Sequence, residues 1–181
     1  RTITKIKATE TLIRKYLLSN PSRYDHSQAS SLIINLHGFG DCASDFSKSV
    51  GKSYGLDDLA DRERFITVYA QAAYRSTKDD TYWETGDNGG ANIEENDIYY
   101  IEQVISDIDK DYNVDLDRVY AVGYSNGGMM TYSLACNRSN FFAGIGIMSG
   151  TMLTETCNNT NPVPIIKFHG IEDGVLLYEG N

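Results

Sequence analysis

The chain has 181 residues, of which 41% are hydrophobic, and its formal net charge is −9. This length and composition predict one globular domain over residues 1–181 and exclude a disordered chain. The acidic balance argues against a nucleic-acid partner, which needs a basic face, and no apolar run reaches the roughly 18 residues of a membrane span.

The first part of the chain predicts four strands and two helices. Alternating residues near the amino terminus are typical of two strands joined by a turn, and the apolar run SLIINLH is typical of a strand buried in a sheet. We expect polar loops over Pro21–Ser30 and Gln71–Gly90. The predicted strands are Thr2–Glu10, Leu12–Ser19, Ser31–His37 and Phe65–Tyr69, and the predicted helices are Ala43–Tyr54 and Leu56–Asp61.

The second part of the chain alternates regularly between helices and strands. Isoleucines at three- and four-residue spacing predict a long helix with one apolar face, formed by Ile98, Ile101, Ile105 and Ile108. Asp115-Leu116-Asp117 ends the connection that follows. The remaining predicted elements are a strand at Arg118–Val122, a helix at Asn126–Asn137 and strands at Phe142–Met148 and Pro164–Phe168. This alternation predicts an α/β fold with a mostly parallel sheet and crossover helices.

The segment Gly123-Tyr124-Ser125-Asn126-Gly127 fits the pattern G-x-S-x-G. The pattern is informative here because it joins a predicted strand to a predicted helix. A sharp turn at that junction lifts the serine hydroxyl off the end of the sheet, and the helix directs its amino-terminal N–H groups at the same point. The pattern therefore predicts that Ser125 is a nucleophile, rather than an incidental serine in a glycine-rich turn.

Two further segments supply the partners that such a nucleophile needs. A His-Gly turn follows the predicted strand that ends at His37, and it can present a backbone donor to the oxyanion of an acyl-transfer reaction. We expect the N–H groups of Phe39 and Asn126 to form that oxyanion hole. Asp173 follows the last predicted strand, where this kind of fold places the acid of a catalytic triad, and Glu172 is its local competitor.

The general base has no obvious source in this sequence. A triad in the order Ser, acid, His needs a histidine after Asp173, and none follows it. His26 lies in an early loop, and His37 and His169 each end a strand immediately before a glycine. Histidines in such places are structural more often than catalytic, so we expect none of the three to be the base.

No pattern in the sequence predicts a metal or a cofactor. The glycine-rich stretch over residues 86–90 lacks both a leading strand and the lysine of a phosphate-binding loop. Asp107, Asp109 and Asp111 alternate as in a calcium loop, but the glycine and glutamate of that loop are missing, so they are expected to lie on a solvated helix face. Trp83, the single tryptophan, either anchors its loop or forms a wall of the substrate site.

Several of these segments are similar to the polyhydroxybutyrate-depolymerase-like esterases, α/β-hydrolases related to feruloyl and acetylxylan esterases. The similarity extends over about Arg14 to Gly180 and rests on LHGFGDCASDF, on WETGDNGGANIEENDIYYIEQVISDIDKDYNVDLDRVYAVGYSNGGMMTYSLAC and on PIIKFHGIEDGVLLYEG. It implies helices on both faces of the sheet, a nucleophile at Ser125 and a triad acid at Asp173. It also implies oxyanion donors at Phe39 and Asn126, and Trp83 matches a tryptophan that family members carry near the site.

The resemblance also carries implications about cysteines and substrate contacts. It implies a disulfide between Cys136 and Cys157, which leaves Cys42 unmatched. With Trp83, we expect Tyr124, the neighbour of the nucleophile, to contact the substrate. Members of the family continue past the acid, through another strand, to a loop that bears the catalytic histidine. This chain lacks that segment, so we expect a C-terminally incomplete domain.

The sequence thus predicts a serine esterase that forms an acyl-serine and acts on short-chain, feruloyl or acetyl esters, or on a polyester. Two alternatives are a non-catalytic or fragmentary member of the same fold and a serine peptidase on that fold. We expect a small-molecule or polymer ester as the partner, no cofactor, no nucleic acid and no membrane, and the sequence leaves the oligomeric state open. We expect a mature secreted chain, with a cytoplasmic location as the alternative.

Overall fold

The computed structural model describes residues 2–4, 13–75, 80–85, 93–153, 157 and 161–180. The described strands are β1 (Thr2–Thr4), β2 (Ile13–Ser19), β3 (Ser30–Leu36), β4 (Ile66–Ala70), β5 (Tyr74–Arg75), β6 (Asp80–Thr81), β7 (Val114–Tyr124), β8 (Gly144–Met148) and β9 (Ile165–Phe168). The helices are α1 (Ala43–Phe46), α2 (Leu56–Glu63), α3 (Ile93–Asp111) and α4 (Asn126–Asn137), with the π-helix η1 (Ser47–Ser53) and the 3-10 turn η2 (Ser139–Phe141). The glycine-rich stretch over 86–90 and most of the predicted strand Thr2–Glu10 lie outside the described residues.

Seven of these strands form one twisted sheet in the order β1-β2-β4-β3-β7-β8-β9. The pairs from β4 through β3, β7 and β8 to β9 are parallel, while β1 and β2 are antiparallel to each other and β2 is antiparallel to β4. In the register, Leu36 pairs with Gly123, and Tyr124 pairs with Met148. The carboxyl ends of β3, β7 and β8 therefore meet at one edge of the sheet, the edge where α/β folds place their ligands.

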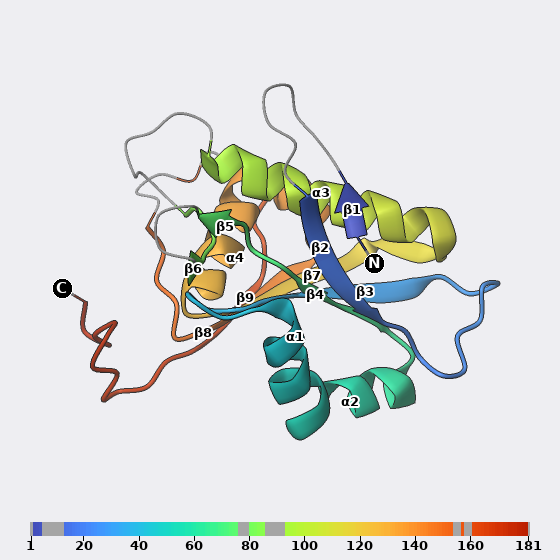
Figure 1. The fold of residues 1–181 in the computed structure, drawn as a ribbon, viewed down its shortest axis with the longest axis horizontal. Helices are drawn as coiled ribbons and strands as arrows, with labels where there is room; N and C mark the ends of the chain where they lie inside the picture. Colours follow the sequence, from blue (N-terminus) through green and yellow to red (C-terminus); the bar gives the residue numbers. More distant parts are fainter. Residues whose placement is uncertain are drawn as a thin grey trace.

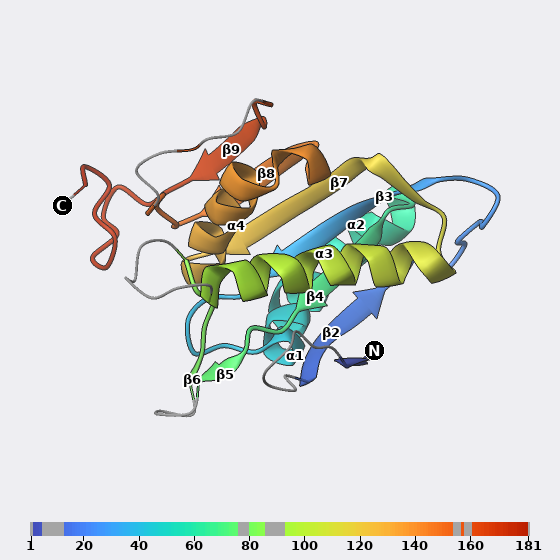
Figure 2. The same ribbon diagram turned by 90° about the horizontal axis from the view of Figure 1, so that it is seen from above.

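Helices cover both faces of the sheet, as Figures 1 and 2 show. The helices α3 and α4 lie on one face, and α1 and α2 lie on the other. The periodic isoleucines of α3 are all buried, as their spacing predicts. The core beneath them is formed by buried residues of the central strands, among them Leu32, Ile34, Val68 and Ala121. No helix in the described ranges combines the length and the apolar character needed to cross a membrane.

The α/β class and the central elements match the sequence-based prediction, and the differences are local. The predicted helix Ala43–Tyr54 is an α-helix only to Phe46 and continues as the π-helix η1. The predicted loop Gln71–Gly90 contains the short antiparallel pair β5 and β6. The strand β7 begins at Val114, so Asp115–Asp117 belong to it rather than to a connection. That extension follows from pairing, since Val114 pairs with Ser30 of β3.

Candidate active site

Ser125 lies at the sharp turn between β7 and α4, at the carboxyl edge of the sheet. Its backbone angles are φ 51° and ψ −119°, a conformation that a residue with a Cβ rarely adopts. Two hydrogen bonds hold the turn: the Ser125 N–H donates to the Met148 carbonyl of β8 at 2.9 Å, and the Met129 N–H donates to the Ser125 carbonyl at 3.0 Å. A strained serine fixed at a strand-to-helix turn is the geometry of a nucleophile elbow.

The two glycines of the pattern are required by close backbone contacts. A Cβ on Gly123 would lie 2.1 Å from the carbonyl oxygen of Gly127, and a Cβ on Gly127 would lie 2.2 Å from the carbonyl oxygen of Leu36. Neither distance is compatible with a side chain. Glycine at these positions lets α4 begin directly against the ends of β7 and β3, which brings Ser125 close to the loop that follows β3.

The loop after β3 lies beside Ser125, as expected for an oxyanion loop. A Cβ on Gly38 would lie 3.6 Å from the Cβ of Ser125. The Phe39 ring is 60% exposed and stacks on Tyr82 with ring centroids 5.6 Å apart. Within the described part of the chain, the N–H groups of Phe39 and Asn126 donate no hydrogen bond. The geometry therefore leaves both predicted oxyanion donors available to a ligand.

Asp173 lies in the loop after β9, beside Ser149, the residue that follows β8. Its Oδ1 accepts the N–H groups of Leu176 and Val175, each at 3.0 Å, and these bonds lower the pKa of the carboxyl. A hydrogen bond with the Ser149 side chain also favours the charged form. Glu172, the competitor, is exposed. The carboxylate of Asp173 is thus ionised and held by its own loop, as an orienting acid must be.

His37 is buried behind the loop that follows β3, and both of its ring nitrogens form hydrogen bonds. Its Nε2 accepts the Ala72 N–H at 3.1 Å, so the proton is on Nδ1, which donates to the Gly38 carbonyl at 2.8 Å. Gln71 Nε2 also lies 3.3 Å from that Nε2. Burial lowers the pKa of the imidazole. These partners make His37 a neutral structural residue, as its place in the sequence predicts.

His169 makes its hydrogen bond within its own loop. Its side chain is 5% exposed, and its Nε2 donates to the Leu176 carbonyl at 2.7 Å and lies 3.6 Å from Asp173 Oδ2. Its Nδ1 is buried and has no hydrogen-bond partner in the described residues. The strand β9 is two strands away from β7, roughly 10 Å at the usual strand spacing. His169 therefore supports the loop that holds Asp173.

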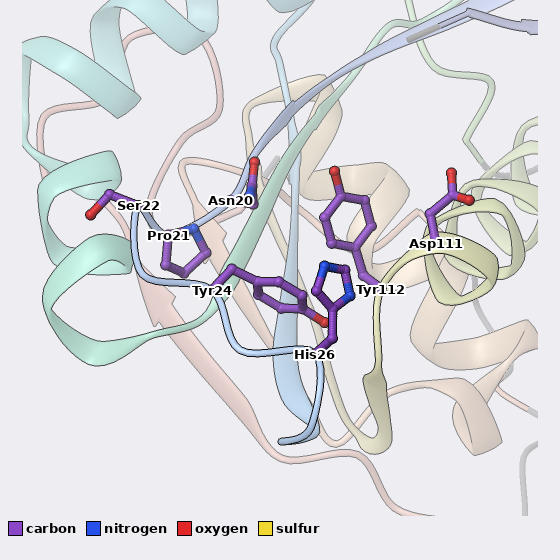
Figure 3. A pocket seen from close by; sticks show the side chains of 7 residues that line it. All are labelled: Asn20, Pro21, Ser22, Tyr24, His26, Asp111 and Tyr112. Carbon is purple, nitrogen blue, oxygen red and sulfur yellow. The ribbon is translucent and has the colours of Figure 1, made fainter.

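His26 lies at the opposite edge of the sheet, in a shallow depression of about 510 Å³ that Figure 3 shows. Its ring packs edge-on against Tyr24, with centroids 4.7 Å apart, and lies nearly parallel to Tyr112. The depression is formed by the loop before β3 and the end of α3, whereas Ser125 follows the carboxyl end of β7. His26 therefore lies far from the predicted nucleophile.

The two predicted substrate contacts lie in different environments. Tyr124 is 46% exposed beside Ser125, and its ring packs over Gly38. Trp83, in contrast, is only 1% exposed, and its indole N–H donates to the His37 carbonyl at 2.9 Å. The burial of Trp83 counts against the predicted contact with the substrate, because its ring is covered by the core, and that contact stays a prediction. The alternative, that Trp83 anchors its loop, matches its contacts.

Two other sets of residues have clear places in the structure. Cys136 and Cys157 form a disulfide that joins the end of α4 to the segment after β8, and Cys42 is a free thiol. Asp107 lies within α3 and accepts the Tyr16 hydroxyl at 2.8 Å, as expected of a helix face rather than a calcium loop.

Sequence reasoning missed a buried ion pair behind the site. Arg14 Nη1 donates to Asp97 Oδ1 at 2.7 Å, and both side chains are at most 5% exposed. The two residues are 83 positions apart, so no local pattern relates them. The one signal in the sequence was Asp97, a charged residue on the apolar face of the predicted helix, because a buried charge must be paired.

Comparison with known proteins places this geometry in a family. Residues 16–180 match the family model described as Esterase PHB depolymerase. The chain belongs to that family. The matched range contains the turn at Ser125, the loop at Phe39 and the loop at Asp173, so the resemblance seen in the sequence is confirmed.

Curated relatives of the PHB depolymerase esterases match over most of this chain. It is 31% identical over 170 residues to a protein of Aspergillus clavatus named "Probable feruloyl esterase C", a match that covers 92% of this chain and 57% of the relative. It is 33% identical over 150 residues to a bifunctional acetylxylan esterase/xylanase of Neocallimastix patriciarum, covering 83% of this chain and 20% of that protein. The chain thus spans little more than half of the feruloyl esterase relatives.

Solved structures of low sequence identity share the fold. A thermostable esterase matches with a TM-score of 0.76 at 19% identity, over 99% of this chain and 48% of that one. The acetyl xylan esterase from Aspergillus awamori matches with a TM-score of 0.63 at 18% identity, over 84% of this chain and 52% of that one. These likenesses confirm the α/β-hydrolase fold predicted for this PHB depolymerase family member.

Proposed function

We propose that the protein is a carboxylic-ester hydrolase that forms an acyl-serine on Ser125. The observation that carries the proposal is the strained turn that holds Ser125 between β7 and α4, beside the N–H groups of Phe39 and Asn126, which donate no hydrogen bond to any described residue. The family match and the esterase names of the relatives support the reaction class.

The mechanism has two half-reactions. The Ser125 Oγ attacks the ester carbonyl carbon and gives its proton to a base, and the carbonyl oxygen becomes an oxyanion that accepts hydrogen bonds from the N–H groups of Phe39 and Asn126. The C–O bond to the alcohol then breaks, and the alcohol leaves with the proton. Water attacks the acyl-serine in the same way and releases the acid. The positive end of α4 favours the oxyanion at both stages.

The base in this proposal is a histidine outside these 181 residues, oriented by Asp173. The contacts of His37 and His169 and the distant position of His26 support that assignment, because the described rings of His37 and His169 bond to Gly38, Ala72 and Leu176, and His26 lies in a different depression. The greater length of the feruloyl esterase relatives is consistent with it. A carboxylate cannot easily replace the histidine, because the base that accepts the serine proton needs a pKa near neutral pH.

The proposed substrates are feruloyl or acetyl esters, such as those on plant polysaccharide, with a polyester as the other possibility within the family. The names of the relatives support the first two, and the family description supports the third. The exposed rings of Phe39 and Tyr124, with Tyr82 stacked on Phe39, offer an aromatic surface for such an acyl group. Rates on methyl ferulate, acetylated xylan and polyhydroxybutyrate would rank the three.

The proposed location is extracellular. The disulfide between Cys136 and Cys157 supports this location, because such bonds form and persist in oxidising compartments.

The test is hydrolysis of p-nitrophenyl acetate by the natural protein at full length and by its Ser125→Ala variant. We expect kcat to fall by at least about a thousand-fold, because the covalent step is lost while binding and the oxyanion donors remain. A fluorophosphonate probe should label the wild-type protein on the peptide that contains Ser125. Ser133→Ala, a serine on the same helix away from the turn, is the matched control and should retain activity.

Three results would contradict the proposal in different ways. Equal rates in the wild type and in Ser125→Ala would exclude Ser125 as the nucleophile. Background rates in both, with no labelling by the probe, would favour a non-catalytic member of the fold. Cleavage of peptides that depends on Ser125, without ester hydrolysis, would favour a peptidase.

A further inference from the structure

The segment over residues 80–85 is fastened to the oxyanion loop by three hydrogen bonds. The Gly40 N–H donates to the Thr81 carbonyl at 2.8 Å, and the Thr81 hydroxyl donates to the Asp41 carbonyl. The third bond, from the indole of Trp83 to the His37 carbonyl, is 2.9 Å long and buried. These bonds bracket Phe39, whose N–H is a proposed oxyanion donor, on both sides.

The same segment holds the first residue of α4 by a pair of hydrogen bonds. The Trp83 N–H donates to Asn126 Oδ1 at 2.7 Å, and Asn126 Nδ2 donates to the Trp83 carbonyl at 3.0 Å. These two hydrogen bonds fix the carboxamide of Asn126 in one orientation. Because Asn126 directly follows Ser125, it also fixes the peptide that carries the second proposed oxyanion donor.

Trp83 can serve as a fixed point because it is itself anchored in the core. Its ring packs nearly parallel to that of Tyr100, with centroids 6.4 Å apart. The next residue, Glu84, donates its N–H to Asp97 Oδ2 at 2.9 Å, and Asp97 is paired with Arg14. The Arg14 guanidinium lies over the Tyr100 ring at 4.1 Å. The network around Trp83 is therefore buried and densely bonded.

We infer that Trp83 is a positioning residue for the oxyanion hole: through its indole, its N–H and its carbonyl it sets the spacing between Phe39 and Asn126. The inference rests on the proposed esterase function. An oxyanion hole acts only if its donors already stand where the charge develops, and an error near 1 Å costs about a hundred-fold in rate. One residue bonded to both sides of the hole meets that requirement.

The direct test is Trp83→Phe in the natural protein at full length. Phenylalanine keeps a packed ring but removes the indole donor to the His37 carbonyl. We expect kcat to fall about ten- to a hundred-fold while KM stays within about two-fold, since the lost interaction favours the transition state alone. Affinity for a trifluoromethyl ketone, whose serine adduct carries the oxyanion, should fall by the same factor as kcat/KM.

Tyr16→Phe is the matched control. It also removes one hydrogen bond from a buried aromatic side chain, since the Tyr16 hydroxyl donates to Asp107, but it lies between β2 and α3 away from the hole. We expect its kcat to match the wild type even where its melting temperature falls as much as that of Trp83→Phe. The inference would be overturned if kcat fell in both variants in proportion to the fall in melting temperature.

Asn126→Ala tests the other side of the hole, where the backbone of Trp83 holds Asn126, and it serves also if Trp83→Phe folds poorly. Asn126 is only partly buried, and alanine removes both side-chain bonds to Trp83 while keeping the Asn126 backbone donor. We expect a similar loss in kcat, and a double variant that loses less than the product of the two single losses, because both substitutions disturb the one spacing that Trp83 sets between Phe39 and Asn126. Multiplicative losses would count against a shared role in that spacing.

Hydrogen exchange separates this inference from the proposed function. If Trp83 positions the hole, the amide hydrogens of residues 37–41 and 126–129 exchange faster in Trp83→Phe than in the wild type. Their exchange rates in Tyr16→Phe equal those of the wild type. Both expectations hold whether or not the protein hydrolyses esters. Unchanged exchange in both segments of Trp83→Phe would overturn the role of Trp83. Faster exchange in a protein whose Ser125→Ala variant keeps full activity would overturn the esterase mechanism alone.

Discussion

At the scale of single residues, His37 shows how burial changes the chemistry of a side chain. A histidine before a glycine at a strand end is a possible base in the sequence, but the structure encloses its ring and bonds both nitrogens. Desolvation lowers the pKa of the imidazole below its value in the unfolded chain. The folded protein therefore requires the neutral ring, while the unfolded chain takes up a proton below pH 6.5.

This difference predicts that stability depends on pH through His37. Because the folded pKa is the lower one, the contribution is fully present above about pH 6.5 and is lost as the pH falls below it, by at most about 1.4 kcal/mol per pH unit. Urea denaturation at several values between pH 5.5 and pH 7.5 should give this slope for the wild type and a shallower one for His37→Gln. Identical slopes in the two proteins would contradict the prediction.

Residue roles differed in how far the sequence predicted them. The sharp turn at Ser125 can be predicted from a local pattern, because the G-x-S-x-G motif is formed by neighbours in the chain. The inferred positioning role of Trp83 cannot, because it depends on Asn126, 43 positions away, and on His37, 46 positions away. Arg14 and Asp97 are likewise related only by folding. Contacts between residues distant in the chain leave no periodic signal in one sequence.

At the scale of elements, helix propensity and packing favour different residues at Gly127, where β7 meets α4. Glycine in the first turn of a helix costs roughly 1 kcal/mol relative to alanine, so helix propensity alone favours Gly127→Ala. Packing forbids the substitution, since the added Cβ would lie 2.2 Å from the Leu36 carbonyl oxygen of a neighbouring strand. The contact between α4 and β3 thus outweighs the preference of the helix.

We therefore expect Gly127→Ala to destabilise the protein by about 3 kcal/mol or more, in the upper range for overpacked sites. It should also lower esterase activity, because relief of the clash would push α4 and Ser125 away from β3. Gly144→Ala is the control, since its Cβ would meet only ordinary contacts, the nearest at 3.5 Å. Chemical denaturation measures both variants, and a Gly127→Ala protein as stable as Gly144→Ala would be inconsistent with the packing described.

The elements themselves were predicted where a pattern is strong and local. The helix α4 has the predicted bounds, and α3 contains every predicted isoleucine on its buried face. The π-helix over Ser47–Ser53 and the short pair β5 and β6 were not predicted, because both depend on contacts with the rest of the fold. Propensity does not distinguish a π-helix from an α-helix in a polar segment.

At the scale of the whole molecule, the strand β9 stands at one end of the sheet. It pairs with β8 on one side, and no strand of the described residues pairs with it on the other. All four of its residues are exposed, among them Ile165, Ile166 and Phe168 at 53–58%. An exposed apolar edge strand is a ready template for pairing with another chain.

The polypeptide of residues 1–181, expressed alone, should therefore self-associate as its concentration rises. Ile166→Lys should reduce that association, because a charge on an edge strand opposes strand pairing. Val175→Lys adds the same charge at an exposed apolar residue of the following loop and should have little effect. Sedimentation velocity measures all three, and a polypeptide that stays monomeric at every concentration would refute the prediction.

The sequence by itself determined the α/β class, the order of the central elements, the turn at Ser125 and the family, because each depends on patterns among near neighbours or on similarity along the chain. The tertiary structure decided which histidines are structural, that Trp83 is buried, and that Arg14 pairs with Asp97. The physical reason is the same in each case. Burial and long-range hydrogen bonds arise only when distant segments pack together, and they determine whether a polar side chain supports the fold or faces the substrate.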